Sequence, residues 1–230
     1  MKLPITFSLT KKENIWGFRY LAFQFLALPL LLFGLNEFLP TPMDDTKINV
    51  IYYAINFLAV AWIFRDFLGK NIDALAQRPM QVLKAVLFGF ARYFVLSVMV
   101  GNLVLMLDPD FMNANDAAIT EMVEGNFVLM TVGTVMLVPV VEECLFRGLI
   151  FRNLYDKSST AAYLVSTIAF SSVHIVGFLF VYSPMDILIS FLQYLPAGLC
   201  LAWAYVRADT IFAPIFIHTI VNAIGMYTMR

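Results

Sequence analysis

Long apolar stretches constrain this chain more than any other feature of its sequence. A helix needs about 20 apolar residues to cross the hydrocarbon core of a bilayer, and seven stretches approach or exceed that length. They cover residues 16–38, 49–64, 80–107, 127–151, 160–182, 185–206 and 210–229. Only 13% of the 230 residues are charged and 61% are hydrophobic, whereas soluble domains carry about 25% charged residues. The sequence therefore predicts an all-α, polytopic membrane helix bundle with about seven transmembrane helices.

The positions of Lys and Arg predict the orientation of this bundle, because positively charged loops are retained on the cytoplasmic side. Lys11 and Lys12 precede the first apolar stretch, and the connection 65–79 carries Arg65, Lys70 and Arg78. The next connection, residues 108–125, holds five acidic residues and no basic one. This alternation predicts a cytoplasmic N-terminus and a C-terminus on the opposite side.

The charge and cysteine content narrow the classes of function. The net charge is −1 and there is no basic tail or face, so the chain lacks the positive surface that nucleic-acid binding requires. Cys144 and Cys200 lie in apolar stretches without CxxC spacing, which argues against a disulfide framework or a thiolate metal site. We expect two buried free thiols and no nucleic-acid partner.

Two adjacent carboxylates, Glu142 and Glu143, interrupt the apolar run VPVVEECLFRGLIF. An ionised carboxylate near the centre of a bilayer costs at least about 2.5 kcal/mol, so such residues persist where a partner or a function compensates. Glu143 and Arg147 are four residues apart, which places them on one helix face as an ion pair. Glu142 is rotated by about 100° from its neighbour and therefore needs other partners.

Both histidines of the chain, His174 and His218, fall in later apolar stretches, and His218 shares a helix face with Asn222. Together with Glu142 they form a set able to hydrolyse a bond. The glutamate can take a proton from water, and the imidazoles and the amide can orient that water or stabilise an oxyanion. Two histidines and a glutamate are also a catalytic Zn²⁺ ligand set, so the residues leave metal-dependent and metal-free mechanisms open.

The spacing of these residues forms three motifs in order along the chain. They are EExxxR at Glu142, Glu143 and Arg147, FxxxH at Phe170 and His174, and HxxxN at His218 and Asn222. This set resembles the CPBP family of intramembrane endopeptidases, the CAAX protease and bacteriocin-processing proteins, also called the Abi family. The resemblance implies two parts, the N-terminal transmembrane spans in residues 1–125 and a catalytic helix core in residues 126–230.

The resemblance also implies roles for the motif residues. Glu142 and His174 would activate water, while His218 and Asn222 would stabilise the oxyanion or, with a metal, serve that ion. Glu142, His174 and His218 would be the metal ligands in that case. Glu143 and Arg147 would be a supporting pair.

The resemblance implies a multi-pass protein of the bacterial plasma membrane that contacts lipid and cleaves a membrane-associated peptide or protein. Peptide maturation, bacteriocin immunity and signalling proteolysis are all compatible with it. Two other hypotheses compete with an enzyme. One is a non-catalytic immunity or interaction protein on the same scaffold, and the other is a transporter, because intramembrane carboxylates and histidines also build ion paths.

Overall fold

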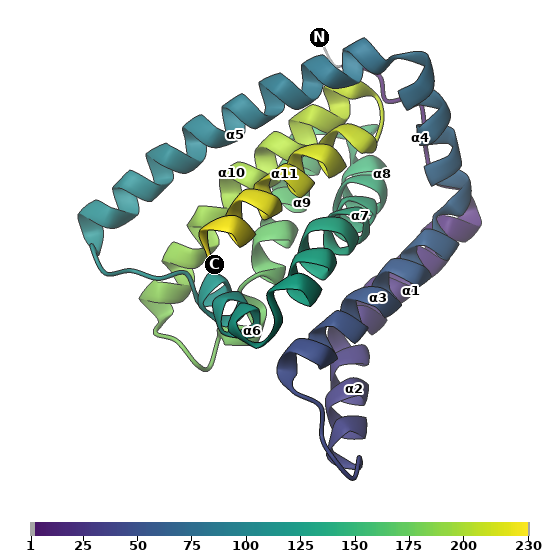
Figure 1. Ribbon diagram of the computed structural model, residues 1–230. Helices are drawn as coiled ribbons and strands as arrows, with labels where there is room; N and C mark the ends of the chain where they lie inside the picture. The colour runs from purple at the N-terminus through teal and green to yellow at the C-terminus, as the bar shows by residue number, and fades with distance from the viewer. Residues whose placement is uncertain (1–2, 230) are drawn as a thin grey trace.

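The computed structural model describes residues 3–229, which form a bundle of helices without a strand (Figure 1). This confirms the all-α prediction. The elements are α1 (Lys11–Leu26), α2 (Leu28–Glu37), α3 (Asp45–Ile63), α4 (Arg65–Gln77), α5 (Pro79–Leu107), α6 (Ala114–Thr131), the π-helical η1 (Val132–Leu137), α7 (Val138–Glu143), the π-helical η2 (Cys144–Phe151), α8 (Arg152–Tyr155), α9 (Ser159–Val173), the short 3₁₀ turn η3 (Val176–Phe178), α10 (Pro184–Ala208) and α11 (Phe212–Thr228).

Helices occupy most of each predicted apolar stretch, and the polytopic membrane architecture is confirmed. The exception is the stretch 160–182, in which α9 ends at Val173 and residues 174–182 form turns and η3. Within the described residues, four helical stretches are long and apolar enough to cross a membrane: α3, α5, α10 and the continuous run from Ala114 to Tyr155. α1 and α2 pass the same test together, although they are bent by 41°. α9 and α11 are shorter, with 15 and 17 residues. The number of crossings and their orientation stay predictions.

One predicted connection, residues 65–79, is largely helical instead. It forms α4, which buries Phe67, Asn71 and Ala74 on one face. The backbone N–H of Ile211 donates to Oδ1 of Asn71 over 2.8 Å, which attaches α4 to the start of α11. From the sequence this segment is predicted to be a connection, because its charged residues are unlike a membrane span. A helix at a surface needs only one apolar face, however, and α4 is such an amphipathic helix.

The helical run that carries the glutamates starts at a kink. Asn126 has non-helical backbone angles, φ −162° and ψ 92°. Its side-chain Oδ1 accepts a hydrogen bond from the backbone N–H of Leu129 over 3.1 Å, which is how an N-cap residue begins a new helix. The sequence predicts a span from residue 127, and the kink falls at that boundary although the preceding residues 114–125 are also helical.

The run of α7 and η2 lies in the interior of the bundle and contacts α3, α9, α10 and α11 (Figure 1). Leu145, Leu149 and Phe151 in η2 are fully buried. Cys144 and Cys200 are buried and free, as expected. π-helical turns are uncommon and are often found at functional sites, and here η1 and η2 flank the helix that bears both glutamates.

Gly198 lets α9 and α10 approach closely, which leads to a stability prediction. A Cβ at Gly198 would lie 2.6 Å from Cγ2 and 3.0 Å from Cα of Thr167. We expect Gly198→Ala to lower the free energy of unfolding by about 1–3 kcal/mol, because overpacking forces backbone shifts. Gly69→Ala is the matched control, since nothing lies within 4 Å of its Cβ position. Equal unfolding free energies for both variants, measured in lipid bicelles, would contradict the close approach.

Candidate active site

The six polar residues of the sequence motifs come together from four parts of the bundle. Glu142 and Glu143 lie in α7, Arg147 in η2, His174 directly after the last residue of α9, and His218 and Asn222 in α11. α11 contacts α7, and α9 contacts η2, so helix packing brings the histidines to the glutamates.

Glu143 and Arg147 form a fully buried pair, with both side chains 0% exposed. Nη1 of Arg147 donates to Oε1 of Glu143 over 3.0 Å, and Nη2 donates to the carbonyl oxygen of Gly198 over 3.2 Å. The guanidinium carbon also lies 4.3 Å from the ring centroid of Phe170. Oε1 of Glu143 is in addition 2.9 Å from Nδ1 of His218. Glu143 therefore links Arg147 to a histidine of another helix, a contact that the motif spacing did not predict.

Glu142 faces both histidines. Its Oε2 atom is 3.8 Å from Nε2 of His174 and 3.8 Å from Nε2 of His218. This oxygen is buried and accepts no hydrogen bond from any residue in the described range 3–229. Polar groups separated by more than about 3.5 Å are commonly bridged by water. The carboxylate and the two imidazoles thus converge on one position that a water molecule can bridge.

The hydrogen-bond partners of the two Nδ1 atoms define which tautomer each histidine adopts. Nδ1 of His174 lies 2.7 Å from the carbonyl oxygen of Phe170, and Nδ1 of His218 faces the carboxylate of Glu143. Both partners are acceptors, so each Nδ1 carries the hydrogen and donates it. In a neutral imidazole, Nε2 then keeps its lone pair. Each Nε2 accordingly accepts a hydrogen bond in the neutral form and donates one only as imidazolium.

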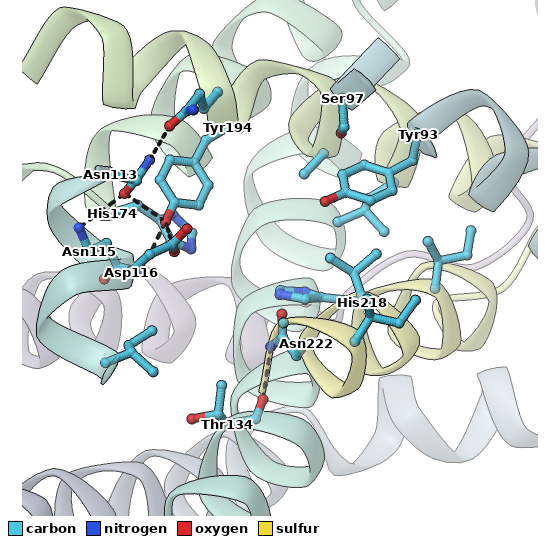
Figure 2. Close-up of a pocket in the computed structure, with 18 of the residues that line it drawn as sticks. Tyr93, Ser97, Asn113, Asn115, Asp116, Thr134, His174, Tyr194, His218 and Asn222 are labelled. Atoms are coloured by element: carbon cyan, nitrogen blue, oxygen red, sulfur yellow. Dashed lines mark hydrogen bonds between the residues drawn. The ribbon is translucent and has the colours of Figure 1, made fainter. Parts of the chain in front are cut away.

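Asn222 lies one helical turn beyond His218 on α11. Its Nδ2 donates to the carbonyl oxygen of Thr134 in η1 over 2.8 Å (Figure 2). A side-chain amide has two N–H hydrogens, and this contact uses one. The bond to η1 fixes the orientation of the amide and leaves its second hydrogen for another acceptor.

These residues line a cavity of about 740 Å³. Glu142, His174, His218 and Asn222 contribute polar groups, while α5 and the end of α11 contribute much of the apolar wall. Within the described residues, the lining contains no Lys or Arg. The volume falls within the range of about 300–1,000 Å³ that is typical of ligand pockets.

A polar cluster at the far side of the cavity was missed by the sequence analysis. Figure 2 shows Tyr194 beside His174, with Asn113, Asn115 and Asp116 around its hydroxyl group. The rings of Tyr194 and His174 are stacked, with centroids 4.2 Å apart. Nδ2 of Asn115 donates to the Tyr194 hydroxyl over 2.9 Å. The only sequence signals were the polar run NANDAA and the pair Gln193–Tyr194 within an apolar stretch, and neither has a motif spacing.

The side chains of Glu142, His174 and His218 are chemically suited to bind a metal ion. Two Nε2 lone pairs and a carboxylate are ligands that Zn²⁺ accepts, and a histidine whose Nδ1–H is held by a carboxylate is common around zinc. However, no group of three His, Cys, Asp or Glu side chains between residues 3 and 229 is arranged to hold a metal ion. A metal role for Glu142, His174 and His218 therefore stays a prediction.

Comparison with known proteins finds two similarities. Residues 124–224 match the family described as type II CAAX prenyl endopeptidase Rce1-like. The three motifs, from Glu142 to Asn222, all lie inside this match. A Bacillus subtilis (strain 168) protein named "Putative membrane peptidase YdiL" is 26% identical over 226 residues, which cover 88% of this chain and 83% of the relative. The C-terminal part of the chain is therefore similar to the CPBP family, to which the three motifs pointed.

The chain is a multi-pass integral membrane protein, and both similarities support a CAAX-type intramembrane protease at the level of the family. The match begins two residues before the predicted boundary at 125/126, but the division into two parts stays a prediction. No solved structure matches the chain.

Proposed function

We propose that this chain is an endopeptidase of the CPBP type that hydrolyses a peptide bond in a membrane-associated peptide or protein, with water activated by Glu142 and His174. The observation that carries the proposal is the convergence of two Nε2 atoms on Oε2 of Glu142, at 3.8 Å each, in the wall of a large cavity. A water molecule at this position donates one hydrogen to Glu142 and the other to His174.

The hydrolysis then follows from the atoms that surround this position. The water oxygen attacks the scissile carbonyl carbon, and Glu142 takes the water proton. The carbonyl oxygen becomes an oxyanion, which is stabilised by the second N–H of Asn222. Nε2 of His218 donates a second hydrogen bond to it when His218 enters the step already protonated, and this histidine keeps its proton throughout. Glu143 holds the ring of His218 in place through its contact with Nδ1. The C–N bond breaks when the proton passes from Glu142 to the leaving amine.

The cavity wall supports a membrane-associated substrate. Phe90, Phe94 and Val98 of α5 line the same cavity as the polar groups of α11. An apolar segment of a substrate can lie against them while its scissile bond meets Glu142. Such a site is suited to a peptide segment that reaches it from the lipid phase.

A proteolysis assay on the purified protein tests this proposal. Wild type in proteoliposomes, incubated with a panel of membrane-tethered peptides, is expected to cleave at least one of them, with products assigned by mass spectrometry. A parallel sample with a chelator, coupled to metal analysis, separates metal-free from metal-dependent catalysis. Full activity in both Glu142→Ala and His174→Ala would leave the non-catalytic immunity protein or a transporter as the better hypothesis.

Tyr194 provides a prediction about positioning. Its ring stacks on His174, so we expect Tyr194→Leu to lower kcat by about 10-fold to 100-fold through misplacement of the imidazole, with a smaller change in KM. Tyr194→Phe keeps the stacked ring and is expected to restore most of kcat. If the Leu and Phe variants have the same kcat, the stacked ring does not position His174.

A further inference from the structure

A second cavity lies between α5 and α10, away from the candidate active site. Its volume is about 530 Å³. It is lined by Met80, Gln81, Lys84, Ala85, Phe88, Arg92, Trp203 and Arg207. None of these residues lines the cavity of Glu142 and the histidines, so this pocket is a separate site from the candidate active site.

Three cationic side chains make this pocket positively charged. Lys84, Arg92 and Arg207 are all exposed, and no Asp or Glu of residues 3–229 lines the pocket. In the part of the chain that the structure describes, none of the three lies in an ion pair with a carboxylate. The pocket therefore carries positive charge that no side chain of the described residues neutralises.

The side chain of Trp203 brings two of these cations together. The guanidinium carbon of Arg92 lies 4.0 Å from the Trp203 ring centroid, and that of Arg207 lies 5.4 Å from it. Cation–π contacts within about 6 Å are attractive. Arg92 belongs to the middle of α5, but long helical side chains point back toward the N-terminus of their helix, where Lys84 and the end of α10 lie. The three charges thus line one pocket beside the first half of α5.

Polar contacts fasten α5 and α10 to each other at this end. Nη1 of Arg78 donates to Oδ2 of Asp209 over 2.9 Å, and Nε2 of Gln81 donates to the carbonyl oxygen of Arg207 over 2.9 Å. These bonds join the start of α5 to the end of α10. The walls of the pocket are therefore held in place although the cationic side chains are exposed.

Exposed apolar side chains surround the cations. Met80 and Phe88 line the pocket and are 59% and 60% exposed, and Leu83 and Leu87 beside them on α5 are exposed as well. A ligand that fits such a surface has an anionic group for the pocket and an apolar part for the outer face of α5. The connection between the second and third apolar stretches, which lies next to the pocket, is predicted to be cytoplasmic.

We propose that the pocket between α5 and α10 binds the phosphate-bearing headgroup of an anionic phospholipid, with the acyl chains lying along α5. Basic pockets between membrane helices on the cytoplasmic side are suited to anionic lipid headgroups. The planar guanidinium groups of Arg92 and Arg207 can each donate two hydrogen bonds to phosphate oxygens. Lys84 adds a third positive charge.

The experiment compares lipid retention by the full chain in nanodiscs that contain phosphatidylcholine with increasing phosphatidylglycerol, read out by native mass spectrometry. Wild type is expected to retain phosphatidylglycerol preferentially. Arg92→Gln, Arg207→Gln and Lys84→Gln are each expected to weaken this retention by about fivefold, because one cation near an anionic surface contributes that much. Equal retention by wild type and the three variants would overturn the proposal.

Arg19→Gln is the matched control. Arg19 also lies over a tryptophan, with its guanidinium carbon 5.1 Å from the Trp16 ring centroid, but it lines neither of the two cavities described above. Its loss should leave phosphatidylglycerol retention unchanged, and a decrease equal to that of Arg92→Gln would indicate a non-specific charge effect.

Two further measurements keep the outcome decisive. If a variant unfolds in nanodiscs of phosphatidylcholine alone, the retention of phosphatidylglycerol by wild type is measured in 1 M salt instead. Salt screens exposed charges, so the wild type should then lose its preference for phosphatidylglycerol over phosphatidylcholine. Inorganic phosphate added to the detergent-solubilised protein tests the other source of the same chemistry. Thermal stabilisation by millimolar phosphate equal to that by phosphatidylglycerol would show a site for the free anion and overturn the assignment to lipid.

Discussion

Replacing Glu142 with Gln is expected to lower kcat for peptide hydrolysis by about 10²-fold to 10⁴-fold, which is the usual contribution of a general base. Gln has nearly the same size and can still hydrogen-bond to water, but it cannot take the water proton. Oε2 of Glu142 receives no hydrogen bond from the described residues, so the substitution breaks no contact that holds the fold. The loss should therefore appear in kcat and not in stability.

The measurement is the initial rate of cleavage in proteoliposomes, together with the unfolding temperature of each variant. Glu121→Gln is the control, because Glu121 is an exposed carboxylate of α6 that does not line the cavity. It should cleave at the wild-type rate. Wild-type activity in Glu142→Gln would exclude this glutamate as the base, and a matching loss in Glu121→Gln would point to a general effect of charge.

Replacing Arg147 with Met is expected to lower the free energy of unfolding by about 3–5 kcal/mol, because removal of one partner leaves a buried charge uncompensated. Glu143 and Arg147 are both 0% exposed, so water cannot replace the lost partner. The Gly198 carbonyl oxygen loses its donor as well. We also expect lower activity in the folded fraction, since Glu143 contacts His218.

Unfolding in lipid bicelles measures this effect. The double variant Glu143→Gln/Arg147→Met is expected to recover part of the stability, because it leaves no unpaired buried charge. Lys47→Met is the control: Lys47 pairs with Asp44 at 2.7 Å, but both side chains are more than half exposed, so little change is expected. A loss in Arg147→Met as small as in Lys47→Met would contradict the structural role of the buried pair.

Much of the fold could be predicted from the length of the apolar stretches in the sequence. A span is recognisable because about 20 apolar residues must be consecutive to cross the bilayer, and all seven stretches contain a helix, although the one in 160–182 ends at Val173. The segment 65–79 shows the limit of that reasoning, since α4 is helical through the burial of Phe67 on one face and not through continuous apolarity. The number of crossings is not decided by helical structure alone, because α9 and α11 are shorter than a full span.

The sequence by itself determined which residues share a helix face, because the i, i+4 spacing is a local property of helical geometry. It therefore placed Arg147 next to Glu143, and Asn222 on the same face as His218. Only the tertiary structure decided that Glu143 also contacts His218, that both Nε2 atoms face Glu142, and that Tyr194 stacks on His174. These contacts join residues of different helices, so they depend on how the helices pack, which no spacing along one helix encodes.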